Sequence, residues 1–237
     1  MSEGFYFYCN DKFIKHFAIA ADSFRKVEPN ANATLIGVGK SDKKLKAAAE
    51  KYSFDFALFN PKDLVTGLVD SVKAFAFDLV DYNKIIQYDC DFIFHKELSP
   101  LFELADEKIS MVIGHSRGKQ IDQEKYHKIY SALGKYDISV EDSIVYNAGF
   151  YIASRQHHTE VFEEWKKLIL KSPNVASKDQ YALNYLVQTR DLLRELPKKY
   201  NYHSHLPHSD EVVATHYAGH PWHKEHLKTG KSLGLGQ

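Results

Sequence analysis

The sequence has few cysteines, no excess of charge of either sign and no long apolar segment. Two cysteines, Cys9 and Cys90, among 237 residues are too few for a disulfide framework, so we expect a reducing, cytoplasmic location. Thirty-one basic residues balance thirty-one acidic ones, and this balance argues against nucleic-acid binding, which needs a basic excess. An apolar run of about 18 residues is absent, so we expect no membrane span, and the N-terminus shows no signal-peptide pattern.

Short apolar segments alternate with amphipathic ones through the first two thirds of the chain. Apolar runs predict strands at 5–9, 34–38, 54–58, 84–88 and 109–113. Apolar residues at helical spacing predict helices at 13–24, 42–52, 64–80 and 100–105, with two more at 157–170 and 178–187. This alternation predicts an α/β fold with a mixed, mostly parallel central sheet flanked by helices.

The rest of the chain is less regular. Residues 144–152 predict either a strand pair or one bulged strand, and 212–214 predict a short strand that would bring His216 to a sheet edge. Residues 116–142 form a polar, irregular insertion. Because no repeat or Pro-rich linker divides the chain, we expect one catalytic domain over 1–226 and a flexible C-terminal tail over 227–237.

Two acidic residues follow the predicted strand at 84–88. Asp89 and Asp91 stand two positions apart, so in an extended chain their side chains point the same way. Ligands of open α/β sheets bind at the carboxyl ends of the strands, and two carboxylates in an apolar run are costly unless a cation neutralises them. The pattern therefore predicts an Mg²⁺ or Mn²⁺ site that could hold a diphosphate. The alternative is that one aspartate caps the next turn and the other is solvated.

Five segments, whose order along the chain agrees with the family pattern, resemble the donor site of the family 8 glycosyltransferases, which have a GT-A fold. The D-C-D motif is followed by L-S-P-L-F at 98–102 and preceded, sixteen residues before its first Asp, by Lys73. The other segments are CNDKF at 9–13, YNAGF at 146–150, DQYALN at 179–184 and HYAGHPW at 216–222. The resemblance implies a metal-dependent enzyme that moves a hexose from a nucleotide-diphosphate sugar, expected to be a UDP-sugar, to a carbohydrate or other hydroxyl acceptor, with retention of configuration.

The same resemblance implies a function for individual residues. Asp89, Asp91 and His216 would bind Mn²⁺ or Mg²⁺. The nucleotide sugar would contact residues from the first strand, the long helix and the C-terminal segment, namely Cys9, Asn10, Phe13, Lys73, Gly219, His220 and Lys224. Asn147, Asp179 and Gln180 would shape the sugar pocket as catalytic residues. Gln180 is expected beside the anomeric carbon, but a neutral amide is a poor nucleophile, which favours a front-face mechanism.

The C-terminal segment departs from the family pattern. The stretch between Gly219 and Pro221 is two residues shorter than usual, and His220 stands where a phosphate-binding lysine is expected. His223 or Lys224 could supply the positive charge instead. The departure leaves an alternative open, in which the protein is a catalytically silent sugar-nucleotide or carbohydrate-binding module of the same fold.

Two further interpretations have less support in the sequence. Seven of the thirteen histidines lie in the last forty residues, but no cysteine and no H-E-x-x-H motif accompany them, so a dedicated zinc site is not favoured. A metal-dependent phosphohydrolase could also use the D-x-D acids. No nucleophilic Asp or Ser is placed as such an enzyme requires.

Overall fold

The computed structural model describes residues 2–39, 43–60, 69–114, 144–171, 178–207 and 209–218. The predicted insertion at 116–142 and the predicted tail at 227–237 lie outside these ranges. The single domain over 1–226 stays a prediction.

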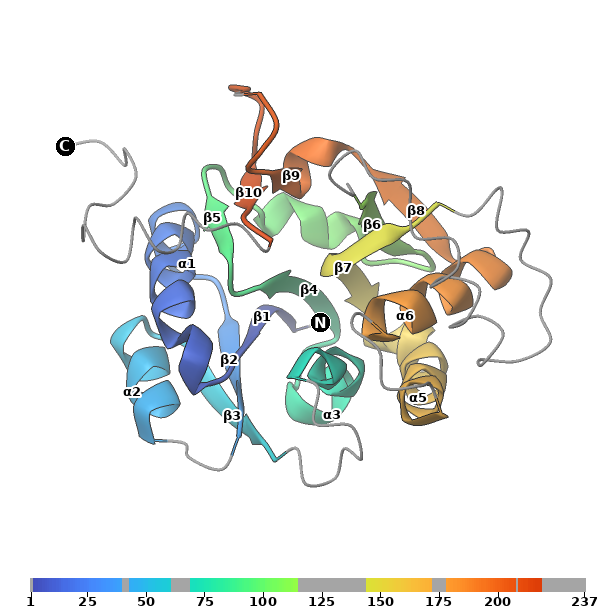
Figure 1. Cartoon of the computed structure of the whole chain (residues 1–237), viewed down its shortest axis with the longest axis horizontal. Helices are drawn as coiled ribbons and strands as arrows, with labels where there is room; N and C mark the ends of the chain where they lie inside the picture. Colours follow the sequence, from blue (N-terminus) through green and yellow to red (C-terminus); the bar gives the residue numbers. More distant parts are fainter. Residues whose placement is uncertain are drawn as a thin grey trace.

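A central sheet of seven strands runs through the described part of the molecule (Figure 1). Its spatial order is β3-β2-β1-β4-β7-β6-β8, and only β7 runs antiparallel to both of its neighbours. The prediction of a mostly parallel sheet is therefore confirmed. The strands are β1 (Glu3–Cys9), β2 (Ala33–Val38), β3 (Asp55–Phe59), β4 (Lys84–Asp89), β6 (Ile109–Ile113), β7 (Tyr146–Ser154) and β8 (Leu193–Leu196).

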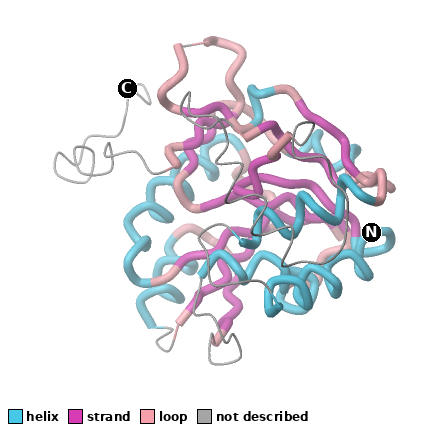
Figure 2. The backbone as a smooth tube through the Cα atoms, turned by 45° about the vertical axis from the view of Figure 1, so that its right-hand side comes forward, coloured by secondary structure: helices cyan, strands magenta, loops and turns pink. Residues whose placement is uncertain are grey.

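Helices cover both faces of this sheet, as the rotated view in Figure 2 shows. The α-helices are α1 (Ile14–Val27), α2 (Lys43–Lys51), α3 (Ala76–Leu79), α5 (Arg155–Lys171) and α6 (Lys178–Thr189). In the part of the chain that the structure describes, four short 3₁₀ helices join them, η1 (Asp11–Phe13), η3 (Val69–Phe75), η4 (Ser99–Leu104) and η5 (Lys198–Tyr200). Both faces of the sheet are buried, which agrees with the continuous apolar runs of its parallel strands.

Aromatic side chains fill the two layers between sheet and helices. On the face covered by α1, Phe7 packs against the rings of Phe17, Phe24, Phe54, Tyr88 and Phe94. On the opposite face, Tyr151 packs edge-on against Trp165 of α5. The Trp165 indole N–H also donates to the Asp179 carbonyl at 2.8 Å, so the core of this face holds the first turn of α6 in place.

A second, three-stranded sheet lies beside the end of β4. It is ordered β5-β10-β9, with β5 (Phe92–Phe94), β9 (Tyr202–His203) and β10 (Ala214–His216). The short strand expected at 212–214 lies two residues later, at Ala214–His216. Val212 still belongs to a turn, since its N–H donates to the Ser209 carbonyl, and the strand that follows lies between two others.

Two other predicted elements differ from the structure. The long helix expected at 64–80 is, over its described part, the 3₁₀ helix η3 followed by one turn of α3. The carbonyl of Lys73 accepts hydrogen bonds from the hydroxyls of Tyr151 (3.1 Å) and Tyr6 (3.4 Å), a position that an α-helical N–H would otherwise occupy. The helix expected at 100–105 is likewise 3₁₀, and the buried Glu28 carboxylate caps it by accepting from the N–H of Leu98 and Ser99.

The bulge expected around residues 147–149 is present. The pairing of β6 with β7 shifts register between Met111, opposite Tyr151, and Val112, opposite Asn147. Residues 148–150 are therefore extra residues on β7, which is one bulged strand. The two cysteines are both free and buried, whereas the cytoplasmic location inferred from them stays a prediction.

We predict that Phe7→Ala destabilises the protein by about 3–5 kcal/mol, because it leaves a cavity among five aromatic rings. Urea unfolding followed by circular dichroism measures the change. Phe13→Ala is the matched control, because the Phe13 side chain is 45% exposed and its loss should change the free energy of unfolding by less than about 1 kcal/mol. Equal losses in the two variants would contradict this description of the core.

Candidate active site

Several chain segments meet at the carboxyl edge of the central sheet. β1 and β4 are parallel neighbours, with Tyr8 opposite Asp89, so the residues that follow both strands lie at the same edge. β7 is antiparallel to β4, and its first residues therefore reach this edge as well. The N-terminal turn of α6 and the end of β10 complete the site (Figure 1).

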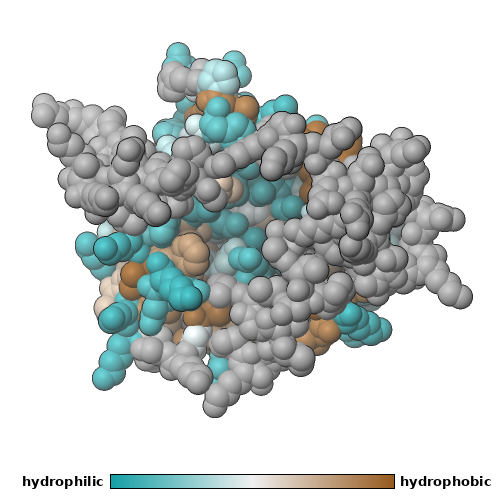
Figure 3. Space-filling model, viewed as in Figure 1, coloured by the Kyte–Doolittle hydropathy of each residue, from teal (hydrophilic) through white to brown (hydrophobic). Residues whose placement is uncertain are grey.

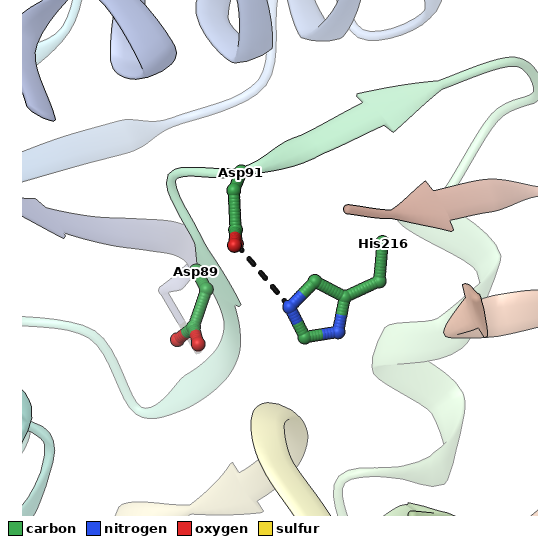
Figure 4. Close-up of side chains that lie close together, drawn as sticks. All are labelled: Asp89, Asp91 and His216. Carbon is green, nitrogen blue, oxygen red and sulfur yellow. Dashed lines mark ion pairs between the residues drawn. The ribbon is translucent and has the colours of Figure 1, made fainter. Parts of the chain in front are cut away.

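Two aspartates and one histidine converge there. Asp89 is the last residue of β4, and Asp91 follows in the tight turn that leads to β5, so the D-C-D motif is a turn and not an extended segment. His216 reaches them from β10, and its Nε2 lies 3.2 Å from Asp91 Oδ1 (Figure 4). One ligand atom from each of the three residues lies within 4.8 Å of the others.

A buried lysine connects two of the acidic segments. The Nζ of Lys73, on η3, lies 3.1 Å from Asp89 Oδ1 and 3.5 Å from Asp179 Oδ2. Asp70, one 3₁₀ turn before Lys73, accepts a hydrogen bond from the Tyr8 hydroxyl at 2.9 Å. Lys73 therefore lies at the centre of an acidic cluster, with its side chain only 5% exposed.

The charges in this cluster shift one another's pKa values. Burial by itself lowers the pKa of Lys73, but the carboxylates of Asp89, Asp179 and Asp70 raise it by more, so the lysine keeps its proton. Burial raises the pKa values of Asp89 and Asp179, and Lys73 opposes that rise. One ammonium group is shared between two carboxylates, which leaves an excess of negative charge at this edge.

Asn147 and Gln180, both expected in the sugar pocket, lie beside this cluster. The Gln180 side-chain oxygen accepts the N–H of Ala148 at 3.1 Å, and Asn147 Oδ1 accepts the N–H of Gly149 at 2.8 Å. Asn184, one turn along α6, binds both the N–H and the carbonyl of Tyr146. These bonds fix the start of the bulged strand to the start of α6.

The residues expected at the nucleobase lie just after β1. Asn10 caps η1 by accepting the N–H of Lys12 at 3.0 Å, and the exposed Phe13 ring contacts the ring of His16 at 5.3 Å between centroids. The Cys9 thiol points into the core and donates to the Asn10 carbonyl. Any contact of Cys9 with a ligand would therefore come from its backbone.

Three expected phosphate-binding residues, Gly219, His220 and Lys224, lie outside the described residues. Hydrophilic residues gather over the central part of the face shown in Figure 3. Among the described residues, the large exposed hydrophobic side chains come from separate parts of the chain and are Phe13, Leu58, Ile144 and Leu170. Single exposed apolar residues are normal on a protein surface, so the exposure of Phe13 alone does not indicate a function.

Comparison with known proteins identifies the family. The model of glycosyl transferase family 8 matches residues 8–226, which include every segment of this site. The chain belongs to glycosyl transferase family 8. The protein is therefore a glycosyltransferase, and the resemblance seen in the five sequence segments is confirmed.

Solved structures of this family show the same fold. The galactosyltransferase LgtC, crystallised with donor and acceptor sugar analogues, is 18% identical, with a TM-score of 0.66 over 96% of this chain and 92% of LgtC. An active-site variant of LgtC gives a TM-score of 0.69 at 17% identity, over 92% of this chain and 87% of that one. The glycosyltransferase GlyE of Streptococcus pneumoniae gives 0.64 at 17% identity, over 93% of this chain and 55% of GlyE. The search of curated proteins found no match.

These structures confirm the GT-A type of fold for this glycosyltransferase. Within its described residues, no helix is both long enough and apolar enough to cross a lipid bilayer.

The residues at this edge fit a divalent cation. Two carboxylates and one imidazole form a donor set of the kind that Mn²⁺ or Mg²⁺ accepts in enzymes that bind phosphates. Gly149 leaves the space between them open, because a Cβ there would lie 2.6 Å from Asn147 Oδ1, 2.8 Å from His216 Cε1 and 2.9 Å from Asp89 Oδ2. No other group of three such side chains occurs among the described residues.

Sequence reasoning missed three residues that support this site. Gln87, fully buried in β4, donates to Asp89 Oδ1 at 2.9 Å, and a polar residue inside an apolar strand was a signal that could have found it. Gly149 lies in the YNAGF motif at 146–150, but the resemblance implied no function for it. Asn201, which contacts both Asn147 and His216, lies in an aperiodic segment with no sequence signal.

We predict that Lys73→Met, measured with a chelator present, lowers the free energy of unfolding at pH 7 by about 3–5 kcal/mol, because it leaves two buried carboxylates without their cation. The pKa values of Asp89 and Asp179 are raised in the folded protein, so their contribution to stability is present below the unfolded pKa of about 3.9 and is lost as pH rises through the folded pKa. The loss caused by Lys73→Met should therefore be smaller at pH 5 than at pH 7.

Lys84→Met is the control for this experiment. Its Nζ pairs with Glu3 at 2.9 Å on the surface, where an ion pair contributes at most about 1 kcal/mol. A loss for Lys73→Met as small as that of the control, or one that does not depend on pH, would show that Lys73 does not neutralise the cluster.

Proposed function

We propose that this family 8 enzyme transfers a hexose from a nucleotide-diphosphate sugar, with a UDP-sugar as donor, to a carbohydrate or other hydroxyl acceptor, and that it requires Mn²⁺ or Mg²⁺. The observation that carries the proposal is the convergence of Asp89, Asp91 and His216 at the carboxyl edge of the sheet. LgtC, with the same fold, was crystallised with donor and acceptor sugar analogues. The hydrophilic centre of the face in Figure 3 suits a polar ligand of this kind.

Asp89, Asp91 and His216 would hold the ion against the diphosphate of the donor. When bound, the ion supplies a Lewis acid that stabilises the negative charge on the leaving nucleotide. Gln87 and Lys73 hold the Asp89 carboxylate in place through their contacts at 2.9 Å and 3.1 Å. We infer that Lys73 orients the first aspartate and lowers the repulsion between the carboxylates, besides any contact with the donor itself.

The arrangement of Asp179 and Gln180 supports retention by a front-face mechanism. Asp179 is buried and paired with Lys73, and the Gln180 side-chain oxygen is bound to the N–H of Ala148. Neither is placed as a free nucleophile for a covalent sugar intermediate. We propose that the leaving phosphate accepts the proton of the acceptor hydroxyl, while Asn147, Asp179 and Gln180 orient the sugar.

The nucleotide end of the donor would lie after β1. We propose that Asn10 and Phe13 contact the base, that Gly219, His220 and Lys224 approach the diphosphate, and that residues 1–226 form one catalytic domain. The position of Phe13 beside His16, close to the end of β1, supports the base contact. Because the stretch at 219–221 is shorter than in the family pattern, the alternative to test is a protein that binds the nucleotide sugar but does not transfer the hexose.

Asp91→Asn should abolish transfer, because it removes an anionic ligand and keeps the side-chain volume. The measurement is nucleotide release from a panel of UDP- and GDP-sugars with Mn²⁺, with and without acceptors. Asp22→Asn, which changes a surface aspartate paired with Lys26, is the matched control and should retain full activity. Chelator should abolish wild-type activity, and Mn²⁺ should restore it.

Three outcomes would contradict the proposal in different ways. Full activity in chelator would exclude the metal. Nucleotide binding without release, in the wild-type protein with every donor and acceptor, would favour the silent binding module. Release of a nucleoside monophosphate and a sugar 1-phosphate, instead of the nucleoside diphosphate, would favour a phosphohydrolase.

UDP should compete with the donor more strongly than GDP does, because the proposed contacts of Asn10 and Phe13 are with a uracil base. Inhibition constants for the two nucleotides, measured with Mn²⁺ present, test this directly. Phe13→Ala should reduce the difference between them, by up to about tenfold if the ring stacks on the base. Equal inhibition by UDP and GDP in the wild-type protein would exclude the uridine assignment without affecting the transferase assignment.

A further inference from the structure

A backbone N–H group at the centre of the site fixes the orientation of the first of two linked asparagines. The N–H of Gly149 donates to Asn147 Oδ1 at 2.8 Å. A backbone N–H can only donate, so the oxygen of the Asn147 amide must face it. The bulge in β7 makes this contact possible, because it turns Gly149 back towards the side chain two residues before it.

The second asparagine is Asn201, which follows η5 and has no exposed surface. Its Nδ2 lies 3.1 Å from Asn147 Oδ1, and its Oδ1 lies 2.9 Å from His216 Nδ1. Since the Asn147 oxygen accepts, the group of Asn201 that faces it must be the NH₂ donor. The Oδ1 of Asn201 therefore faces His216, and only an N–H at Nδ1 can form a hydrogen bond with it.

We propose that Asn201 is a positioning residue for the metal site, which holds His216 with its proton on Nδ1 and its Nε2 lone pair directed at the cation. The inference rests on the proposed metal-dependent function. The direction of every bond in the chain Gly149–Asn147–Asn201–His216 follows from the backbone N–H at its start. Histidine ligands generally need such a partner on the second nitrogen to fix tautomer and ring orientation.

The ring of His216 is also fixed in a second way. It stacks on Phe92 with centroids 4.2 Å apart and planes 16° apart, and the two residues are register partners in β5 and β10. Stacking sets the plane of the ring, and the bond to Asn201 sets which nitrogen faces Asp91. His216 Nε2 lies 3.2 Å from Asp91 Oδ1. With the proton on Nδ1, both of these atoms are hydrogen-bond acceptors, and they face each other unless a cation or a proton lies between them.

The chain of bonds has a consequence for Asn147. Its Oδ1 already accepts two hydrogen bonds, from Gly149 and from Asn201, so any bond to a sugar hydroxyl has to come from its Nδ2. A movement of Asn147 on sugar binding would reach His216 through one intervening side chain. Asn147 and the metal ligand are therefore mechanically linked.

The tautomer of His216 can be measured in the wild-type protein without metal. Nitrogen-15 NMR of the imidazole rings, at a pH where the ring is neutral, distinguishes protonation at Nδ1 from protonation at Nε2. His216→Ala identifies the signal by its loss. We expect the proton on Nδ1. A neutral ring protonated on Nε2 would overturn the inference.

Two variants at position 201 distinguish the hydrogen bond that orients His216 from the packing of the Asn201 side chain. Asn201→Ala removes the acceptor and should weaken Mn²⁺ binding by about tenfold or more, with both His216 tautomers populated. Asn201→Asp keeps an acceptor for Nδ1 and removes the donor to Asn147, so it should restore the Nδ1 tautomer and most of the affinity. Asn32→Ala, which removes an asparagine amide that donates to the Glu3 carbonyl at the opposite end of β1, should leave Mn²⁺ affinity and tautomer unchanged.

Titration calorimetry with Mn²⁺ in the presence of UDP gives the affinities, and thermal unfolding confirms that each variant is folded. If His216→Ala weakens Mn²⁺ binding but Asn201→Ala does not, the function proposed for Asn201 is wrong and the metal site stands. If His216→Ala binds Mn²⁺ as the wild-type protein does, the metal site itself is wrong. If Asn201→Asp loses as much Mn²⁺ affinity as Asn201→Ala, the hydrogen-bond acceptor at position 201 does not determine that affinity.

Discussion

One buried ammonium group holds the acidic edge of the sheet together. Lys73 joins η3 to β4 through Asp89 and to α6 through Asp179, so three segments of the chain depend on a single positive charge. The single positive charge of the lysine does not neutralise all the carboxylates of the site. Asp70 and Asp91 add further carboxylates, and burial keeps the pKa values of Asp89 and Asp179 raised even with Lys73 present. The remaining negative charge is what makes a divalent cation the natural partner of this edge.

The fold supplies the rigidity that such a site needs. Glycosyl transfer with a diphosphate leaving group asks the protein to position two substrates and to stabilise charge, more than to supply a nucleophile. Two of the three candidate metal ligands are held by neighbours, Asp89 by Gln87 and Lys73, and His216 by Phe92 and Asn201. The bulge of β7 brings Gly149 into the middle of the group, where the missing side chain leaves room for an ion. Packing and hydrogen bonding of ordinary strength thus combine into one preorganised site.

Much of this could be predicted from the sequence, because apolar runs and helical spacing report burial directly. The parallel strands, the bulged strand and the meeting of Asp89, Asp91 and His216 followed from local pattern together with family resemblance. The parts that could not be predicted depend on contacts between distant residues. Tyrosine hydroxyls from β1 and β7 bind the Lys73 carbonyl in the 3₁₀ helix η3, and Asn201 contacts Asn147 and His216. The strands β5, β8 and β9 are short, and the segments around them carry no periodicity.

The central claim is that a divalent cation binds between Asp89, Asp91 and His216. A crystal grown with MnCl₂ and UDP, with diffraction recorded on both sides of the manganese absorption edge, tests it most directly. We expect an anomalous peak within about 2.0–2.3 Å of one oxygen from each aspartate and of His216 Nε2, distances typical of transition-metal ligands. A peak elsewhere in the molecule, or nucleotide bound at this edge with no anomalous peak, would contradict it.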